Sequence, residues 1–307
     1  MVRDATVDEF SLLRDNAEDA GLPWTAAPVV RRDAVDVNGR RVSAIVWGDA
    51  PAEAVLLHGG AQNAHTWDTV ALALARPVVA IDLPGHGRSD WRDDGDYGVA
   101  AMADDVAETV RVLAPSASTI VGIGLGAPVA LLVADRLGPA VASLVLIDSA
   151  SGVRAAASPD TATPSQAAAR VAAFTAHHRF ATLEEMVDRT LAYSPSRAGR
   201  AVRRGVHHNA RQQEDGSWSW RWDPRQRGER DYAFDETAAA LGRFAGPILL
   251  VRGELSDIVT DELASAFAAV HPDTQLVTMS GAGHAVQGDR PIELARTVLT
   301  VLPRPVS

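Results

Sequence analysis

Residues 119–136 read TIVGIGLGAPVALLVADR, and this stretch decides the fold of the chain. It begins with β-branched and apolar residues, which are typical of a buried strand. A glycine-rich turn, Gly122-Ile123-Gly124-Leu125-Gly126, follows and opens directly into a segment rich in alanine and leucine, which favour helix. The stretch therefore predicts a strand, a tight turn and a helix in immediate succession.

The same alternation of strand and helix continues on both sides of this turn, as expected for a parallel α/β sheet. Apolar strands are predicted at 54–57, 77–82, 118–122 and 141–148, and helices at about 64–75, 99–114 and 125–137. Residues 29–47 alternate around Asn38-Gly39, a dipeptide typical of hairpin turns, so two antiparallel strands should lead the sheet. A capping box from Thr6 to Glu9 begins an amphipathic helix predicted over residues 6–20.

Polar loops follow four of the predicted strands. The strand at 54–57 runs into His58-Gly59-Gly60, and AIDLPGHGRSD occupies residues 80–90. Near the C-terminus, ILLVRGELSDIV (248–259) places Asp257 a few residues beyond a strand. GAGHAVQGDRP (281–291) then places His284 in the loop after a strand at 276–279. The chain order is thus glycine turn, acid, histidine.

These segments resemble the α/β-hydrolase family over roughly residues 30–305. In that family a strand–turn–helix elbow of the form G-x-S-x-G presents the nucleophile, and the acid and histidine follow in this order. The resemblance implies an α/β fold with a mostly parallel, twisted sheet flanked by helices. It also implies that residue 124 occupies the nucleophile position, which similar proteins fill with Ser or, in some branches, Asp.

The resemblance assigns a role to each remaining site residue. His284 would be the general base and Asp257 the acid that orients it, while Gly60 and Leu125 would donate the two N–H groups of an oxyanion hole. Asp148, at the end of the strand at 141–148, is an alternative acid, because some branches place the acid there. We favour Asp257 from the sequence. His58 and His86 are interpreted as residues of loop structure.

Gly124 departs from the family pattern and excludes its covalent mechanism, because glycine has no atom that can attack a carbonyl. Three interpretations remain open: an enzyme without a covalent step, a serine hydrolase whose nucleophile was replaced, and a pseudoenzyme that only binds a ligand. The retained His284 and its acid favour a catalytic ancestry. The substrate class expected for such a pocket is a small, largely apolar carbonyl compound, namely an ester, lactone or diketone, with no cofactor.

Residues 151–243 differ in character from the rest of the chain. They contain 14 Arg against 11 Asp plus Glu, a net charge of +3, whereas the remainder of the chain carries −13. Helices are predicted near 164–180, 182–193 and 197–211, with a tryptophan-rich turn at 218–223. The predicted organisation is an N-terminal helical extension (1–25), a hydrolase core (26–150 and 244–307) and an inserted helical cap (151–243). Trp67, just after the His58-Gly59-Gly60 loop, is the predicted pocket residue.

One alternative comes from a different class of protein. Gly122, Gly124 and Ala127 also fit the dinucleotide pattern G-x-G-x-x-G/A, and Asp148 follows at a suitable distance for a ribose contact. A dinucleotide-binding oxidoreductase is therefore an alternative. It is weakened because the pattern falls in the third strand-to-helix turn and leaves the loops that contain His58 and His284 unexplained.

Composition excludes several further classes. The net charge of −10 argues against nucleic-acid binding, and the absence of Cys and Lys excludes disulfides, thiolate nucleophiles and Schiff-base chemistry. No metal site is predicted, because the adjacent pairs His177-His178 and His207-His208 point about 100° apart on a helix. No apolar run could cross a bilayer and no signal segment is recognised, so we expect a cytoplasmic protein with a small-molecule substrate and no membrane partner. The oligomeric state stays open.

Overall fold

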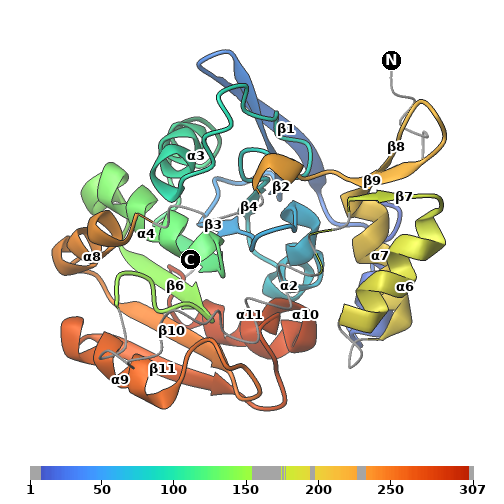
Figure 1. Ribbon diagram of the computed structural model, residues 1–307. Helices are drawn as coiled ribbons and strands as arrows, with labels where there is room; N and C mark the ends of the chain where they lie inside the picture. Colours follow the sequence, from blue (N-terminus) through green and yellow to red (C-terminus); the bar gives the residue numbers. More distant parts are fainter. Residues whose placement is uncertain are drawn as a thin grey trace.

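A twisted eight-stranded sheet forms the centre of the molecule (Figure 1). The computed structural model describes residues 8–153, 174, 176, 178–193, 198–226 and 233–303. In sheet order the strands are β1 (Val30–Val37), β2 (Arg40–Trp47), β4 (Val78–Ile81), β3 (Ala54–Leu57), β5 (Thr119–Ile123), β6 (Ser143–Ile147), β10 (Ile248–Gly253) and β11 (Thr274–Met279). β2 is antiparallel to both β1 and β4, and the other pairings in this sheet are parallel. The predicted α/β class and mostly parallel sheet are confirmed.

The leading hairpin follows the predicted turn. Asn38 and Gly39 both have positive φ angles, 53° and 79°, and join Val37 to its partner Arg40. Positive φ at both central residues is the geometry of a type I′ turn, whose twist matches that of the flanking strands. The Asn-Gly dipeptide therefore fixes the register of β1 against β2.

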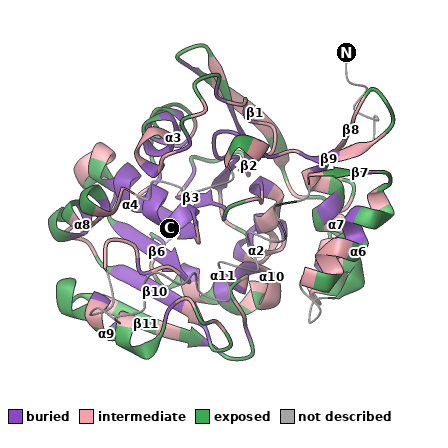
Figure 2. Cartoon of the chain, viewed as in Figure 1, coloured by how far each residue is buried: buried purple, intermediate pink, exposed green. Residues whose placement is uncertain are grey.

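Helices cover both faces of the sheet, so its central strands β4, β3, β5 and β6 are buried on two sides (Figure 2). One face packs against α3 (Val99–Leu113), α4 (Gly126–Leu137), α8 (Phe234–Arg243) and α9 (Asp261–Val270). The other packs against α1 (Leu13–Asp19), η1 (Ala64–Trp67), α2 (Asp68–Leu74), α10 (Val286–Asp289) and α11 (Pro291–Leu299). Along β3, Val55 and Leu57 join the first apolar layer while Ala54 and Leu56 join the second. This accounts for the uninterrupted apolar runs in the sequence.

The chain between β6 and β10 builds a second, smaller unit. Its described part contains β7 (Arg179–Phe180), α6 (Leu183–Tyr193), α7 (Gly199–Asn209), β8 (Ala210–Gln212), β9 (Trp218–Trp220) and η3 (Pro224–Gln226). The three strands form their own sheet in the order β7-β9-β8, and a separate apolar cluster fills the space beneath them. We call residues 178–226, as far as they are described, the insertion.

The insertion agrees only partly with the sequence prediction. The helices predicted near 182–193 and 197–211 correspond to α6 and α7, but the turn predicted at 218–223 begins with strand β9. α8 lies within the range predicted as a cap, yet it packs against α4 of the core. Most of the helix predicted near 164–180 lies outside the described residues.

The N-terminal extension packs on the core through α1, which contacts α2. Thr6 lies outside the described residues. Glu9 binds the guanidinium groups of Arg32 and Arg88, each at 2.7 Å. Arg32 also reaches Asp82 at 2.8 Å, so these charges tie the extension to the loop after β4. Within the described ranges no helix combines the length and apolar character needed to cross a membrane.

Candidate active site

The turn between β5 and α4 brings residue 124 against a histidine. Gly124 has φ +52°, a conformation that side chains other than glycine rarely adopt, and its N–H donates to the Ile147 carbonyl of β6 at 3.2 Å. A Cβ built on Gly124 would lie 3.3 Å from Nε2 of His284 and 3.4 Å from its Cε1. The sequence predicted this juxtaposition from motif order alone.

The neighbouring glycines of the turn are required by close backbone approach. A Cβ on Gly122 would lie 2.2 Å from the Gly126 carbonyl oxygen, and one on Gly126 would lie 2.3 Å from the Leu57 carbonyl oxygen. No side chain fits at either distance. Strand β5 and helix α4 can therefore meet at the sharp angle that aims residue 124 at His284.

His284 pairs with Asp148, not with Asp257. Its Nδ1 lies 2.6 Å from Oδ2 of Asp148. Asp257 is exposed in the loop after β10, whereas Asp148 is fully buried at the end of β6. The choice of Asp257 as the acid beside His284 is therefore wrong, and the alternative that the sequence left open is the one the structure shows.

Asp148 is held rigidly by neighbouring strands. Its N–H donates to the Val251 carbonyl at 2.7 Å, and its φ of +48° is unusual for a residue other than glycine. Oδ2 accepts a 2.5 Å hydrogen bond from Ser256 Oγ, and Oδ1 accepts one from the Gly253 N–H at 3.4 Å. Ser256 was not singled out in the sequence, although it directly precedes Asp257.

These contacts also remove the support for the dinucleotide alternative. That interpretation needs the Asp148 carboxylate to be available to a ribose hydroxyl. The carboxylate is fully buried, and its two oxygens face Ser256, Gly253 and His284. Asp148 therefore serves the histidine.

The loop that carries His284 is fixed at both ends. The Gly283 N–H donates to Oδ2 of Asp289 at 2.9 Å, and the Leu255 N–H donates to the Ala282 carbonyl at 2.8 Å. A Cβ on Gly253 would lie 2.3 Å from the Gly283 carbonyl oxygen, so the loop packs directly on the end of β10. The imidazole itself stays 43% exposed, which leaves it accessible to small molecules.

The loop after β3 lies beside the elbow. Gly59 Cα is 3.8 Å from the Cβ position of residue 124, and Gly60 follows it. Leu125 stands immediately before α4, at the positive end of that helix dipole. Among the residues that the structure describes, neither the Gly60 nor the Leu125 N–H has an acceptor. Both groups are free to meet an anionic oxygen, and their oxyanion-hole role stays a prediction.

Two buried histidines hold this loop in place. His58 Nε2 accepts from the Leu83 N–H at 2.9 Å, while its Nδ1 faces the Gly59 carbonyl at 2.8 Å. Burial lowers the pKa of His58, against an opposing effect of Asp82. His86 Nε2 accepts from the Ala61 N–H at 3.2 Å. Their interpretation as residues of loop structure is confirmed.

Trp67 does not line an open pocket. Its side chain is fully buried in the apolar layer under α2 and α11, where it packs with core residues. A wall residue of an open pocket would keep accessible surface. A cavity of about 170 Å³ lies elsewhere, between Pro128 of the first turn of α4, residues 149–153, Phe234, Thr237 and Ile258. This cavity begins one residue beyond Asp148 and is lined largely by apolar side chains.

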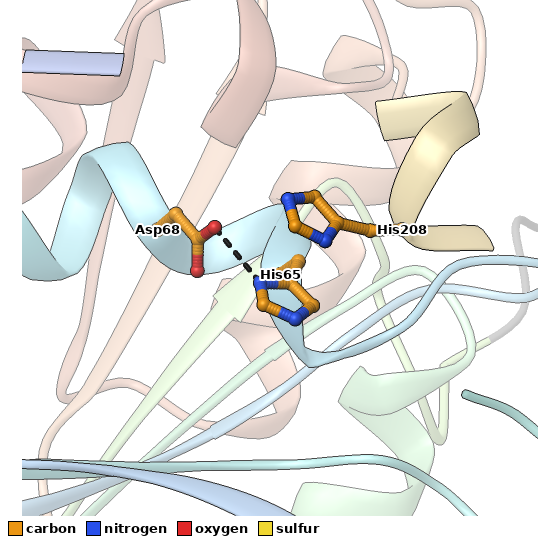
Figure 3. A group of neighbouring side chains, drawn as sticks. All are labelled: His65, Asp68 and His208. Atoms are coloured by element: carbon orange, nitrogen blue, oxygen red, sulfur yellow. Dashed lines mark hydrogen bonds and ion pairs between the residues drawn. The ribbon is translucent and has the colours of Figure 1, made fainter. Parts of the chain in front are cut away.

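A second group of titratable side chains lies at the junction of core and insertion (Figure 3). His65 of η1, Asp68 of α2 and His208 of α7 place ligand-type atoms within 4.8 Å of one another. The sequence predicted no metal site here, because it considered His208 only with its neighbour His207; His208 is half-buried. Sequence spacing could not find this group, because 140 residues separate His208 from Asp68.

Comparisons with known proteins agree with the fold described above. Residues 54–297 match the alpha/beta hydrolase family. Esterase Rv0045c of Mycobacterium tuberculosis is 38% identical over 304 residues, which cover 95% of this chain and 96% of that protein. Pimeloyl-[acyl-carrier protein] methyl ester esterase of Yersinia pseudotuberculosis is 28% identical over 271 residues, covering 82% and 93%.

Solved structures give the same result. A crystal structure of the mycobacterial esterase superposes with a TM-score of 0.81 at 37% identity, covering 97% of this chain and 99% of that one. A second structure of that esterase, from work on its inhibition by transition metals, gives a TM-score of 0.82 at 35% identity with the same coverage. The chain belongs to the alpha/beta hydrolase family.

Proposed function

We propose that the protein is a hydrolase-derived enzyme that acts on a small, largely apolar ester, lactone or diketone. His284 is its general base and Asp148 orients and stabilises that base. The observation that carries this proposal is the 3.3 Å between His284 Nε2 and the Cβ position of Gly124. A histidine so placed, with its acid intact, is arranged for chemistry at residue 124.

The tautomer of His284 follows from its partner. The Asp148 carboxylate accepts from Nδ1–H, so Nε2 of the neutral ring keeps a lone pair that points toward residue 124. Because Gly124 has no side chain, a water molecule or an acidic C–H of the substrate can occupy that space. Nε2 takes a proton from water as the water oxygen attacks the carbonyl carbon, and the Gly60 and Leu125 N–H groups stabilise the charge on the carbonyl oxygen. The C=O bond then re-forms, the bond to the leaving oxygen or carbon breaks, and Nε2 returns its proton to that leaving group.

The substrate class is supported by the relatives and by the cavity. The two curated relatives named above are esterases. The cavity beside Asp148 is apolar and small, which suits a short acyl or alkyl group. In this proposal the insertion acts as a cap that excludes water from the site.

The test is a panel of small esters and lactones assayed on the wild-type protein, Gly124→Ser and His284→Ala. A natural non-covalent enzyme is active with Gly124, loses that activity in His284→Ala and gains nothing from the serine. If a serine was replaced, Gly124→Ser instead gains hydrolysis by several powers of ten. Inactivity of all three proteins, with ligand binding retained, would contradict catalysis and leave the binding interpretation.

The identity of the acid has its own matched test. In whichever of these proteins is active, Asp148→Asn should lower kcat/KM at least about 100-fold, because the base loses its orientation and charge. Asp257→Asn, an exposed change in the loop after β10, should leave kcat/KM unchanged. A larger loss of kcat/KM in Asp257→Asn than in Asp148→Asn would contradict this assignment and make Asp257 the acid that orients His284.

A further inference from the structure

The group formed by His65, Asp68 and His208 stands apart from the proposed catalytic residues. His65 and Asp68 lie at the start of the first core helix after β3, and His208 comes from the last turn of α7 in the insertion (Figure 3). His65 Nδ1 is 2.9 Å from Asp68 Oδ2. The His65 and His208 rings stack with centroids 3.7 Å apart and planes 12° from parallel.

Two buried polar atoms of this group lack a hydrogen-bond partner among the described residues. Asp68 Oδ1 and His208 Nε2 have no hydrogen-bond partner among the described residues, and the Asp68 side chain is only 2% exposed. Leaving such atoms unsatisfied is unfavourable, because each loses its hydrogen bonds to water and gains none in the protein. Both belong to residue types that coordinate metals, and Figure 3 shows the imidazole of His208 directed toward the same space as the Asp68 carboxylate.

The local electrostatics also favour a cation. Burial lowers the pKa of His65 and of His208 to about 3, so both rings are neutral, the form that binds metals. Burial raises the pKa of Asp68 to about 7, so its ionised form lacks sufficient compensation. A divalent ion would supply that charge.

We propose that His65 Nδ1, Asp68 and His208 Nε2 form a binding site for one divalent transition-metal ion of the zinc class. Two imidazoles and one carboxylate suit Zn²⁺, Co²⁺, Ni²⁺ or Cu²⁺, whereas Mg²⁺ and Ca²⁺ prefer oxygen ligands. Three protein ligands leave a fourth tetrahedral position for water. This site is independent of the proposed esterase-type function.

Binding requires small, specific adjustments. The ion takes the place of the Nδ1 proton of His65, which now faces Asp68 Oδ2, and that proton passes to Nε2 through solvent, so the ring stays neutral. Because imidazole lone pairs lie in the ring plane, His208 must rotate out of its stack to bind the same ion. The Nε2 of His65 then carries hydrogen, so its 3.3 Å contact with Arg32 Nη2 must lengthen. Arg32 keeps Glu9 and Asp82 as partners.

The ion would hold the insertion against the core. The residue after His208 is Asn209, whose Nδ2 donates to the Ala61 carbonyl at 2.7 Å in the loop beside the elbow. A metal bond at His208 therefore acts one residue from an existing contact between the two units. Binding should stabilise the folded protein, since the ligands come together only in that state.

The experiment measures metal binding directly, without an activity assay. The full-length wild-type protein is titrated with Co²⁺, whose visible absorption reports tetrahedral nitrogen and oxygen ligands, and Zn²⁺ is added to displace it. We expect one equivalent to bind and Zn²⁺ to raise Tm. His208→Gln should weaken the affinity at least about tenfold. His207→Gln, a change at the exposed neighbouring histidine, is the matched control and should bind as the wild type does.

A second measurement keeps the test valid if a variant folds poorly. Histidine ring ¹H–¹⁵N spectra of the wild-type protein should show Zn²⁺-dependent shifts at His65 and His208 while the resonances of His271 stay in place. The proposal is overturned if the wild type binds no stoichiometric metal, or if His208→Gln binds as tightly as the wild type. It is also overturned if Zn²⁺ shifts histidines other than these two.

Discussion

At the scale of single residues, Gly124 combines two constraints that act in the same direction. Its φ of +52° disfavours any side chain, and the Cβ position lies 3.3 Å from His284 Nε2, closer than most real Cβ contacts. Glycine therefore relieves strain at a position where the family ordinarily accepts strain to present a nucleophile. At residue 124, glycine therefore favours stability, whereas a nucleophilic side chain would favour catalysis at the expense of stability.

The first prediction follows from this opposition. Gly124→Ala should lower the free energy of unfolding by about 1–3 kcal/mol, offset in part by the lower entropy of the unfolded chain. Thermal unfolding measures the change. Gly216→Ala is the matched control, because Gly216 also has a positive φ, +82°, but nothing lies within 4 Å of its Cβ position. A higher Tm for Gly124→Ala than for the wild type would contradict the strained-elbow assignment.

The site residues show what sequence can and cannot identify. His284 and Gly124 could be predicted because each stands in a local motif that the turn geometry requires. The acid could not be chosen reliably, because both Asp148 and Asp257 follow strand ends. Which carboxylate reaches Nδ1 depends on how β6 and β10 align beside each other, and in the structure Asp148 takes the position beside His284 that Asp257 was expected to take.

The second prediction concerns the buried His58. Its folded-state pKa lies below the ordinary value of 6.5, so the unfolded chain binds more protons at acidic pH. His58 therefore contributes stability that is fully present above pH 6.5 and is lost as pH falls below it, by at most about 1.4 kcal/mol per pH unit. Denaturant unfolding of His58→Gln should show a weaker loss of stability than the wild type between pH 6.5 and 5.

The charged and titratable neighbours of His58 are the same in the wild type and in His58→Gln, so they do not account for a difference in the pH dependence of stability. Asp82 and His86 face the His58 ring, and both remain in the variant. His207→Gln, at an exposed histidine, is the control for replacing a histidine elsewhere in the chain. Parallel slopes for His58→Gln and the wild type would show that His58 does not titrate differently on folding.

At the scale of elements, the predicted strands and helices of the core agree with the structure to within a few residues. β3, β5 and β6 are fully buried, so apolar runs bounded by turn residues mark them clearly in the sequence. The strands of the insertion have two or three residues each, too short for any period to appear. Their pairing depends on contacts between distant segments, chiefly those of Phe180 and Trp220.

The third prediction uses α7, a helix with glycine in its interior. Gly205 is exposed, and nothing lies within 4 Å of its Cβ position. Gly205→Ala should therefore raise the free energy of unfolding by about 0.5–1 kcal/mol, because alanine favours helix more strongly than glycine does. Gly199→Ala, at the first residue of the same helix, should have a smaller effect. Equal or opposite effects in thermal unfolding would argue against a regular helix at residue 205.

At the scale of the whole molecule, polar contacts in several places join the insertion to the rest of the chain. Arg204 of α7 binds Asn16 and Asp19 of the N-terminal extension, each at 2.7 Å. Asn209 binds the Ala61 carbonyl and receives a 3.3 Å hydrogen bond from Asn63. Charge composition predicted a distinct unit here, but not its attachment, which rests on single side chains such as these and Tyr97, whose Oη donates to Asp223 Oδ2 at 2.5 Å.

The fourth prediction tests this attachment at the end nearest the proposed active site. Asn209→Ala removes both side-chain hydrogen bonds and leaves the Ala61 carbonyl without that partner, a loss of about 0.5–1.5 kcal/mol for each bond. Amide hydrogen exchange of residues 59–66 and of α7 should become faster, because the loop and the helix open together more often. Gln212→Ala is the control, since the Gln212 side chain is exposed and, among the described residues, donates to the Gly216 carbonyl of its own hairpin at 3.2 Å and not to the core. If the cap proposal holds, Asn209→Ala should also raise KM more than it lowers kcat, since loosening the loop weakens substrate binding while His284 and Asp148 keep their geometry. Unchanged exchange in residues 59–66 would mean that other contacts hold the insertion, such as the 2.5 Å hydrogen bond from Tyr97 Oη to Asp223 Oδ2, and that Asn209 contributes little to docking.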